Sequence, residues 1–377
     1  MGHFRKKQIT IFPTNTCNMN CSYCVATSSI NRKNDSSIDI EFALKGISDY
    51  FTDEDKHQIR FYSNGEPTCR MDIIKECHSY ANSLIQQRKI TNQSSNDLLS
   101  EIQTNCNFDE ETACWLGENI NYIWASIDGW PEIQKKYRPD IKNPSSATKI
   151  IRNVEQILRI KEEHKHDSFI GVRVTIVNET VSKQVELLKY FSDLGITEVC
   201  SEPCFLPVDS PSIKKKITLV DLRQYIINFV EAWHKAKEIG INYLNSFMVN
   251  FDEKVEYSCR TCLPTPHLTV DGFVSSCDLA FHGNTSMPEL LFGKYNQKTK
   301  SIDYWQDAIE NLRSRKCINI SKCQNCSIKD YCGGGCLGRA FHETNDFYGV
   351  IDEYCWATRY LYNNIDLNDF RIKHLHP

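Results

Sequence analysis

The sequence predicts an α/β protein built on a parallel sheet, either open or curled into a partial barrel, followed by a smaller cysteine-rich region. Six β-prone segments alternate with helical segments up to residue 202, and strand-then-helix repeats of this kind form parallel sheets. After residue 250 the cysteines become dense and long apolar periods become few. A chain of 377 residues is long enough to bury a large core in the first part and still carry the second.

Each predicted strand is rich in Ile, Val, Tyr or Phe, which favour extended backbone. The predicted strands are residues 8–13, 58–63, 98–104, 120–127, 169–177 and 196–202. The helical segments between them are 39–51, 71–88, 109–118, 147–164 and 182–194, and a loop at 203–218 leads into a further helix at 219–239. Ligands of parallel sheets bind beyond the carboxyl ends of the strands, so the residues that follow each strand are the candidate site.

Composition excludes several classes of protein. The 44 basic and 48 acidic residues argue against a chain whose main role is to wrap nucleic acid or coat anionic lipid. No apolar run is long enough to cross a bilayer, and the start "MGHFRKKQ" has no apolar signal core behind it. We therefore expect a cytoplasmic protein without nucleic-acid or membrane partners. Its 18 cysteines then indicate metal or iron–sulfur ligation rather than disulfide staples, which a chain of this size does not need.

Three cysteines follow the first predicted strand within eight residues, in the stretch "TNTCNMNCSYCVATSS". Three thiolates from Cys17, Cys21 and Cys24 can hold three irons of a four-iron cluster and leave the fourth iron open, whereas a structural zinc site normally completes four ligands. The alternative is a zinc loop that takes its fourth ligand from elsewhere, or unpaired buried thiols.

A second group of cysteines begins after residue 250. Its members are Cys259, Cys262, Cys277, Cys323, Cys326, Cys332, Cys336 and Cys355. Three glycines in "CQNCSIKDYCGGGC" allow the backbone to turn tightly around whatever the thiolates hold. We expect a boundary at 240–255, which divides the chain into residues 1–245 and 246–377, and we expect ligation to stabilise the second part. A zinc-ribbon interpretation of the Cys-x2-Cys pairs leaves the last three cysteines unexplained.

Cys17-x3-Cys21-x2-Cys24, with Tyr23 before the last cysteine, resembles the signature of the radical S-adenosylmethionine (SAM) enzymes. "SNGEPT" at 63–68 resembles that family's Gly-Gly-Glu-Pro element, although Asn64 replaces its first glycine. The resemblance implies a partial (β/α)6 TIM-like barrel and an open iron that binds the amino and carboxylate groups of SAM. It also implies roles for residues after the strands: Gly65, Glu66 and Pro67 near the amino group, Asn105 in the pocket wall, Ser126 toward the ribose and Arg138 toward the carboxylate.

The C-terminal cysteines resemble the SPASM domain of one radical SAM subgroup, because Gly272 lies ten residues after Cys262 and five before Cys277. This small iron–sulfur-binding domain carries two auxiliary four-iron clusters, for a total of three [4Fe-4S] clusters. The resemblance implies the ligand sets Cys259, Cys262, Cys277 and Cys336 for the first, and Cys323, Cys326, Cys332 and Cys355 for the second. The family pattern leaves Cys259 variable, and without it the first auxiliary cluster would have an open iron able to bind substrate.

The resemblance also implies a mechanism. An electron from a flavodoxin- or ferredoxin-type donor enters the first cluster, SAM is cleaved reductively, and a 5′-deoxyadenosyl radical takes a hydrogen atom from the substrate. The auxiliary clusters would then accept an electron, since cluster potentials span about −700 to +450 mV. Asp278 matches the position of a catalytic aspartate in sulfatase-maturing members, where we expect a general base. The alternative is a carboxylate that only hydrogen-bonds near the cluster.

SPASM enzymes mostly modify peptides or proteins. Only 16 residues precede Cys17, so we expect no leader-binding domain and a ribosomal-peptide maturase that forms thioether or carbon–carbon cross-links, with a separate leader-recognition protein or none. A sulfatase maturase that makes formylglycine is the main alternative, although "CGGGCLGRAFHETND" favours the peptide-maturase branch. A radical SAM enzyme for a small cofactor precursor and a non-catalytic iron–sulfur or zinc protein also stay open.

Overall fold

The computed structural model describes residues 8–24, 36–53, 55–62, 64–91, 96–142, 146–164, 168–205, 218–248 and 250–366. Most of the loop expected at 203–218, and Ser63 of the "SNGEPT" stretch, lie outside these residues. None of the helices in the described ranges combines the length and the apolar composition needed to cross a membrane.

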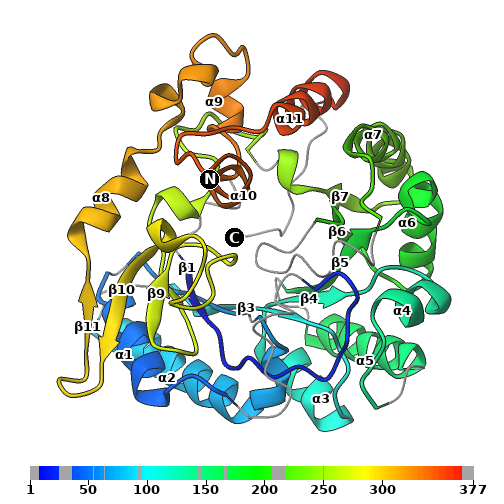
Figure 1. The fold of residues 1–377 in the computed structure, drawn as a ribbon. Coiled ribbons are helices and arrows are strands. Elements are labelled where there is room, and N and C mark those ends of the chain that lie inside the picture. Colours follow the sequence, from blue (N-terminus) through cyan, green and yellow to red (C-terminus); the bar gives the residue numbers. More distant parts are fainter. Residues whose placement is uncertain are drawn as a thin grey trace.

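Seven parallel strands lie side by side in the order of the sequence. They are β1 (Gln8–Ile11), β2 (Gln58–Phe61), β3 (Leu99–Thr104), β4 (Tyr122–Ser126), β5 (Phe169–Ile176), β6 (Glu198–Pro203) and β7 (Asn242–Leu244). The six predicted strands are confirmed, and β7 is an additional strand that the sequence analysis missed because it has only three residues. Figure 1 shows the sheet curving around a central space with the helices outside it, as in an incomplete barrel.

The helices on the outer side are α1 (Ile40–Tyr50), α2 (Met71–Ile90), α3 (Glu110–Asn119), α4 (Pro131–Tyr137), α5 (Ala147–His164), α6 (Gln184–Asp193) and α7 (Leu222–Glu238). All except the short α4 were predicted. Three begin at an aspartate whose side chain accepts a backbone N–H of the first turn: Asp39, Asp109 and Asp221. Such caps satisfy N–H groups that have no partner within the helix and so determine where each helix begins.

The sheet continues across the boundary expected near residue 245. β8 (His267–Leu268) pairs with β1 in parallel, and β9 (Phe273–Ser275), β10 (Leu291–Asn296) and β11 (Ser301–Tyr304) follow as antiparallel neighbours, giving 11 strands. The chain then forms α8 (Gln306–Ser314), α9 (Lys329–Cys332), α10 (Leu337–Thr344) and α11 (Asp352–Asn364). The C-terminal region is therefore attached to the barrel through backbone hydrogen bonds, while the boundary itself stays a prediction.

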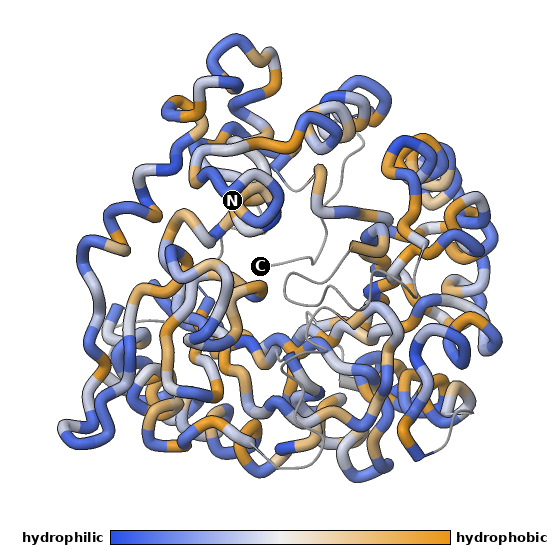
Figure 2. Tube along the Cα trace, in the orientation of Figure 1, coloured by the Kyte–Doolittle hydropathy of each residue, from blue (hydrophilic) through white to orange (hydrophobic). Residues whose placement is uncertain are grey.

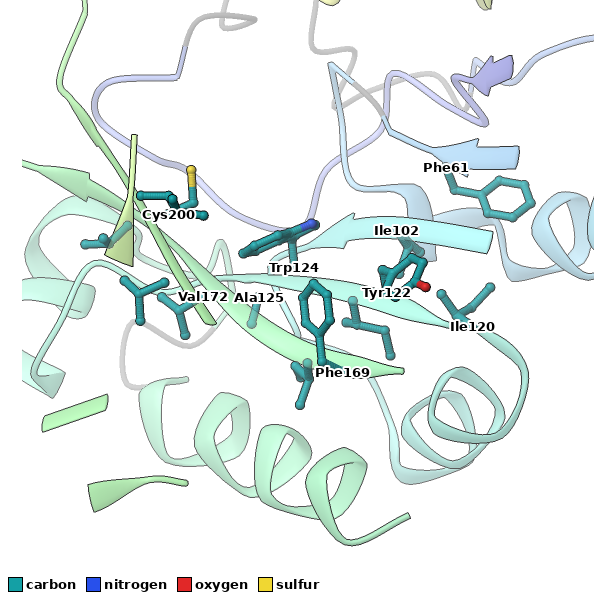
Figure 3. Packing of buried hydrophobic residues seen from close by; sticks show 14 of the residues in the cluster. Phe61, Ile102, Ile120, Tyr122, Trp124, Ala125, Phe169, Val172 and Cys200 are labelled. Carbon is teal, nitrogen blue, oxygen red and sulfur yellow. The ribbon is translucent and has the colours of Figure 1, made fainter. Parts of the chain in front are cut away.

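The two faces of the sheet carry different residues. Ala125 and Val172 point toward the helices, and Trp124 and Cys200 lie on the opposite, inner face (Figure 3). Figure 2 shows hydrophobic stretches along the strands and hydrophilic turns on the outer helices. The inner face also carries buried polar residues, whereas the inside of a closed barrel is normally filled by branched apolar side chains. The interior of this sheet is thus the place to look for a site.

Candidate functional site

The three-cysteine loop, residues 14–24, begins at the carboxyl end of β1 and is held along one side by the segment after α4. The Asn20 N–H donates to the Pro139 carbonyl at 2.7 Å, and the Ser22 N–H donates to the Tyr137 carbonyl at 2.9 Å. These backbone bonds fix the path of the loop, and the Cys17 thiol accepts the Met19 N–H at 3.4 Å.

The thiols of Cys17, Cys21 and Cys24 lie together, as predicted. Burial raises the pKa of the Cys21 thiol to about 11, while Arg138 opposes this and Cys24 adds to it. Burial also raises the pKa of Cys17, with further contributions from Glu66 and from the other two thiols. Thiols that raise one another's pKa favour a bound cation, which removes the repulsion between thiolates.

The Gly65 stretch packs directly on this loop. A Cβ atom at Gly65 would lie 2.3 Å from the backbone oxygen of Thr16, which leaves no room for any side chain. The next residue, Glu66, donates its N–H to the same Thr16 oxygen at 2.8 Å. A glycine is therefore required at residue 65 by close approach of two backbones, and Asn64 in place of the family's first glycine does not prevent it.

The Glu66 carboxylate is buried and bonded to protein donors at both oxygens. One oxygen accepts the Thr68 N–H at 3.1 Å and the Thr104 hydroxyl at 2.6 Å, and the other accepts the Asn105 N–H at 2.8 Å. Burial raises the pKa of Glu66, and these bonds oppose the rise. Glu66 thus caps the short 3-10 helix Pro67–Arg70 and joins the ends of β2 and β3.

Asn105 connects the end of β3 to the cysteine loop. Its side-chain N–H donates to the Asn18 side-chain oxygen at 2.7 Å, and the Asn18 side chain donates to the Asn107 carbonyl at 2.7 Å. Because Asn18 lies between two of the predicted ligands, Asn105 helps to set the spacing of the loop as well as the wall of the pocket.

Arg138 lies beside the cysteine loop and not on the open surface. Its guanidinium donates to the Tyr23 hydroxyl at 2.9 Å, and Tyr23 in turn donates to the buried carboxylate of Asp128. The other oxygen of Asp128 accepts the Thr175 N–H at 3.0 Å. Ser126 is also buried, at the end of β4 two residues before Asp128. The predicted cofactor residues therefore meet at one edge of the sheet.

Four C-terminal thiols form a first group: Cys259, Cys262, Cys277 and Cys336. Burial raises the pKa of Cys277, and Cys336 and Cys259 raise it further. Burial also raises the pKa of Cys262 to about 12, and Cys259 again contributes. The buried guanidinium of Arg315 opposes that rise by charge and by a hydrogen bond to the Cys262 thiol.

Cys323, Cys326, Cys332 and Cys355 form a second group. Burial raises the pKa of Cys332 to about 12, and Cys355 and Cys323 contribute next. Burial likewise raises the pKa of Cys323 to about 11, with Cys355 and Cys326 following. The pKa contributions therefore link thiols within each predicted set, although Cys317 also raises the pKa of Cys323. No three His, Cys, Asp or Glu side chains in the described ranges surround a single metal ion, and the division into two ligand sets stays a prediction.

The three consecutive glycines, residues 333–335, lie between the two groups. All three have positive φ values, 64°, 88° and 69°, which L side chains rarely adopt. The N–H groups of Gly334 and Gly335 hydrogen-bond the Cys332 thiol and lower its pKa. The predicted tight turn is confirmed, and its N–H groups stabilise a thiolate at this position.

A cavity of about 280 Å³ lies between the barrel and the two C-terminal thiol groups. Seven of the eight cysteines of these two groups line it, the exception being Cys262. The barrel contributes Tyr62, Arg173 and Glu202, and the C-terminal region contributes Arg260, His267 and Asp278. The donor set, two groups of four thiols beside this cavity and the three thiols of the loop after β1, fits iron–sulfur clusters.

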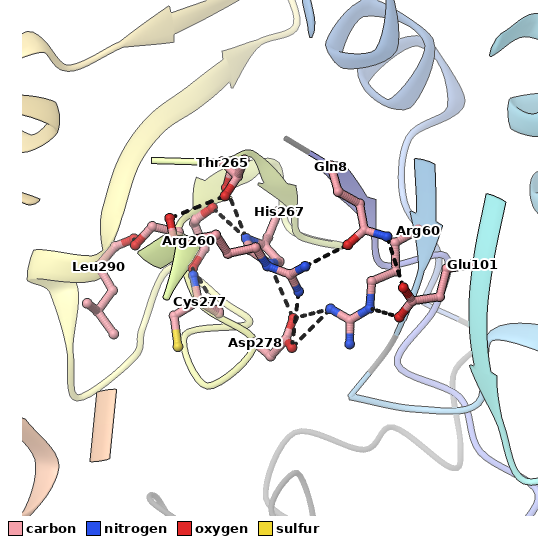
Figure 4. A network of polar contacts seen from close by, with 11 residues as sticks. Gln8, Arg60, Glu101, Arg260, Thr265, His267, Cys277, Asp278 and Leu290 are labelled. Carbon is pink, nitrogen blue, oxygen red and sulfur yellow. Dashed lines mark hydrogen bonds and ion pairs between the residues drawn. The ribbon is translucent and has the colours of Figure 1, made fainter. Parts of the chain in front are cut away.

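Asp278 lies at the centre of a buried polar network (Figure 4). Its oxygens accept from Arg60 at 2.9 and 3.0 Å and lie 3.3 Å from His267 Nε2 and 3.7 Å from Arg260. Burial alone would raise the pKa of Asp278, but Arg60 and His267 outweigh burial and hold it well below its usual range. Such a carboxylate stays charged and is a weak proton acceptor while the network is intact.

His267 is oriented by the backbone. Its Nδ1 lies 3.0 Å from the Thr265 carbonyl oxygen and 3.2 Å from the Ser275 carbonyl oxygen. Carbonyl oxygens only accept, so Nδ1 carries a proton and Nε2 faces Asp278. Burial lowers the pKa of His267.

Residues 11–173 match the family model described as the Radical SAM superfamily. These residues are a radical SAM domain. The domain contains β1 to the middle of β5, with the three-cysteine loop, the Gly65–Glu66 turn and Arg138 inside it.

Relatives extend the likeness beyond this domain. The cysteine-type anaerobic sulfatase-maturating enzyme of Clostridium novyi (strain NT) is 22% identical over 86% of this chain and 85% of its own length. The enzyme of the same name from Clostridium perfringens (strain ATCC 13124) is 21% identical over 90% of both chains.

Solved structures share the fold. The anSMEcpe enzyme with bound AdoMet superimposes with a TM-score of 0.72 at 16% identity and covers 98% of this chain and 99% of its own. Streptococcus suis SuiB bound to the precursor peptide SuiA superimposes with a TM-score of 0.63 at 16% identity and covers 93% and 76%. These likenesses show that the chain shares its fold with anSMEcpe and SuiB along nearly its whole length.

The sequence analysis missed three arginines: Arg60, Arg173 and Arg315. The first two interrupt apolar strands, in "QIRFYS" and "FIGVRVTIV", and a charge within a strand that is otherwise apolar was a usable signal. Arg315 carried no such signal, because its neighbours in "NLRSRKC" are also charged.

Proposed function

We propose that the enzyme oxidatively modifies a peptide or protein, and that its first product class is a thioether or carbon–carbon cross-link in a ribosomal peptide. The observation that carries the proposal is the shared cavity, which is lined by Tyr62 and Arg173 from the radical SAM barrel and by cysteines of both C-terminal groups. A substrate in this cavity would lie between the site of radical formation and the auxiliary thiols.

The residues at the strand ends suit SAM bound at a four-iron cluster. Cys17, Cys21 and Cys24 would hold the cluster, and Arg138, whose Nε is buried without a hydrogen-bond partner, would face the cofactor carboxylate. Gly65, Glu66, Pro67, Asn105 and Ser126 would form the remaining wall. When bound and reduced, this cofactor supplies a 5′-deoxyadenosyl radical that abstracts hydrogen. The protein binds the reactants, orients them and excludes water.

The two C-terminal thiol groups would hold auxiliary four-iron clusters, the first through Cys259, Cys262, Cys277 and Cys336 and the second through the other four cysteines. The grouping of their pKa contributions supports this division. Loss of one hydrogen atom leaves a substrate radical, and formation of the new bond releases one electron and one proton. An electron acceptor and a proton acceptor are therefore both required near the cavity.

Asp278 is our candidate for the proton acceptor. Its side chain is 30% exposed, toward the cavity, but both oxygens contact Arg60. Acting as a base requires that substrate binding loosen this contact, because a carboxylate paired with arginine takes up a proton reluctantly. His267 would then hold the proton or stabilise the protonated carboxyl.

Formylglycine formation is the second candidate. It is favoured by the match to sulfatase-maturating enzymes along nearly the whole chain, whereas SuiB carries a quarter of its length outside the match. Peptides are bound in solved structures of both relatives, SuiA in SuiB and the Cp18Cys peptide in anSMEcpe. For either product we propose a flavodoxin- or ferredoxin-type electron donor, a cytoplasmic location and, for a ribosomal peptide, a separate leader-recognition protein.

The number of clusters is tested by iron and sulfide analysis after anaerobic reconstitution. We expect about twelve irons in the wild type and about eight in a Cys17/Cys21/Cys24→Ala variant. A wild-type value of about four irons with bound zinc would contradict the auxiliary clusters and remove the electron acceptor from the proposal.

The reaction class is tested by incubating the reduced holoenzyme with SAM and synthetic peptides that contain Cys or Ser. We expect 5′-deoxyadenosine together with a peptide that has lost two hydrogen atoms, either as a cross-link or as an aldehyde made from Ser. An aldehyde made from Cys would in addition exchange the sulfur for the oxygen of water, with release of sulfide, and tandem mass spectrometry separates these products. An aldehyde product would select formylglycine formation. The Cys17/Cys21/Cys24→Ala variant is the control and should give neither product.

A further inference from the structure

We propose that Arg173 is a binding site for a carboxylate of the substrate, either an Asp or Glu side chain or the C-terminus of a peptide. This inference rests on the proposed function, since it presumes that a peptide occupies the cavity. Under this proposal Arg173 helps to select the substrate, whereas the cluster and cofactor residues bind the catalytic groups.

Arg173 projects from the inner face of β5. It pairs with Ser126 on β4 and with Cys200 on β6, and its guanidinium carbon lies 5.5 Å from the centre of the Trp124 ring. Gly171 lies two residues earlier on the same face, where a Cβ would be 2.9 Å from that ring. Trp124 is therefore packed tightly beneath the guanidinium, which restricts the paths open to Arg173 and directs it into the cavity.

Within the described residues, the Arg173 side chain has no ion pair or hydrogen bond, and its Nε is buried without a partner. The nearby carboxylates are already engaged. Glu202 accepts the Ser246 N–H and hydroxyl at 2.9 and 2.8 Å and contacts Arg339 at 3.8 Å. Glu101 is 3.1 Å from Arg60.

Unlike the Arg173 side chain, three other buried arginines have protein partners for their guanidinium groups. Arg60 and Arg260 both contact Asp278, and Arg315 donates to four backbone carbonyls. Removing a guanidinium from water without an anion is costly, and stacking on one aromatic ring offsets only part of that cost. A planar guanidinium with free N–H groups matches a carboxylate through two parallel hydrogen bonds.

The position of Arg173 favours the carboxylate of the substrate over that of SAM. Tyr62 packs in the same hydrophobic cluster as Cys24 of the three-cysteine loop, and it lines the cavity together with Arg173 and Asp278. The wall of the cavity that carries Arg173 therefore lies next to the loop where the radical would form. Arg138 is the arginine beside Cys21, so the loop already has a cation for the amino-acid end of SAM.

The test uses cluster-loaded enzyme and a pool of random decapeptides, next to the same pool with every carboxyl converted to a methylamide. Peptides retained with the enzyme are identified by mass spectrometry, and the dissociation constant of SAM is measured separately. Arg223→Met is the matched control, because Arg223 also stacks on an aromatic ring, at 4.4 Å from the centre of Trp356, but is exposed and does not line the cavity. Iron content shows whether each variant has folded and loaded.

We expect wild type and Arg223→Met to retain acidic peptides about tenfold to a hundredfold better than methylamides, and Arg173→Met to lose this preference. The affinity of Arg173→Met for SAM should differ from that of wild type by less than about threefold. A lost charge-assisted hydrogen bond to SAM would weaken its binding by more than threefold. If Arg173→Met loads less iron, Arg173→Lys replaces it and should show a partial loss, because lysine keeps the charge without the planar donors.

Equal retention of both pools by wild type, or an unchanged preference in Arg173→Met, would overturn the assignment. A tenfold weaker affinity for SAM in Arg173→Met would overturn it in favour of the cofactor carboxylate. If wild type binds SAM but retains no peptide from either pool, the proposed peptide function fails first, and the assignment of Arg173 fails with it. Peptide binding without acidic preference contradicts the Arg173 site alone.

Discussion

Arg60 on β2 donates to both oxygens of Asp278, at 2.9 and 3.0 Å, across 218 positions of sequence. The pair belongs to a closed ring of polar contacts. Arg60 also contacts Glu101, and Glu101 accepts a hydrogen bond from Gln8. Gln8 in turn accepts from Arg260 at 2.6 Å, and Arg260 closes the ring by contacting Asp278. The ring joins three barrel strands to the residue after Cys277, so the barrel and the first C-terminal thiol group are positioned by the same charges.

Arg60→Met should lower the free energy of unfolding of the loaded enzyme by about 3–5 kcal/mol, because it removes the buried guanidinium shared by the buried Glu101 and the partly buried Asp278. Anaerobic urea unfolding measures this. Lys45→Met, which breaks an exposed pair with Asp49, should cost less than about 1 kcal/mol. Similar losses in both variants would contradict a structural role for the ring.

Asp278→Asn separates catalysis from positioning. If Asp278 accepts the substrate proton, product formation should fall about 10²- to 10⁴-fold, while 5′-deoxyadenosine formation and iron content stay near wild type. Both compounds are measured by chromatography in the same reaction. Asp278 would have only a positioning role if Asp278→Asn lost iron or stability while its remaining activity still gave as much product per 5′-deoxyadenosine as wild type.

Gly65→Ala should displace the three-cysteine loop, because the new Cβ would lie 2.3 Å from the Thr16 oxygen. We expect about four fewer irons per chain, with the C-terminal clusters retained. Gly240→Ala provides the control. Gly240 also has a positive φ, 75°, but a Cβ added there would have no atom within 4 Å, so the substitution should cost about 1 kcal/mol without loss of iron.

Arg315→Met should destabilise the C-terminal region. Its guanidinium donates to the carbonyls of Phe347, Gly334, Gly335 and Gly349, and methionine would leave these oxygens without a donor. We expect loss of most of the iron beyond the first four, measured by iron analysis and by the remaining electron paramagnetic resonance signals. The exposed Arg313→Met should retain full iron content, and equal loss in both variants would contradict the role given to Arg315.

Lys161 provides a pH-dependent test away from the site. Burial lowers its pKa from 10.5 to about 8, and its ammonium donates to the Ile120 carbonyl at 2.6 Å. Between pH 8 and 10.5 the unfolded chain binds a proton that the folded chain does not, so the free energy of unfolding should rise with pH by up to about 3 kcal/mol.

The difference between wild type and Lys161→Met isolates this effect from the titration of the many thiols. The variant should lack the rise, while Lys149→Met, an exposed position on the same helix, should keep it. Parallel pH profiles for wild type and Lys161→Met would show that the buried lysine does not titrate in this range.

The elements of the barrel and the cysteine groups could be predicted because each is encoded locally. Runs such as "FIGVRVTIV" favour extended backbone wherever they lie, and Asp39 or Asp109 marks a helix start within a few residues. The short α4 and β7 were missed because seven and three residues carry too little periodic signal. The predicted grouping of the C-terminal thiols came from the family resemblance.

By itself, then, the sequence determined the alternating elements, the place of the three-cysteine loop after β1, and the tight turn at glycines 333–335, since these depend on the preferences of near neighbours and on what a backbone can adopt. The requirement for glycine at residue 65 comes instead from tertiary contact with the Thr16 backbone. Only the tertiary structure decided which charges are neutralised. Asp278 forms ion pairs with Arg60 and Arg260, whereas Arg173 packs on the Trp124 ring and lines the cavity. Pairing between residues this far apart in the chain depends on how strands and loops pack, and no local pattern encodes it.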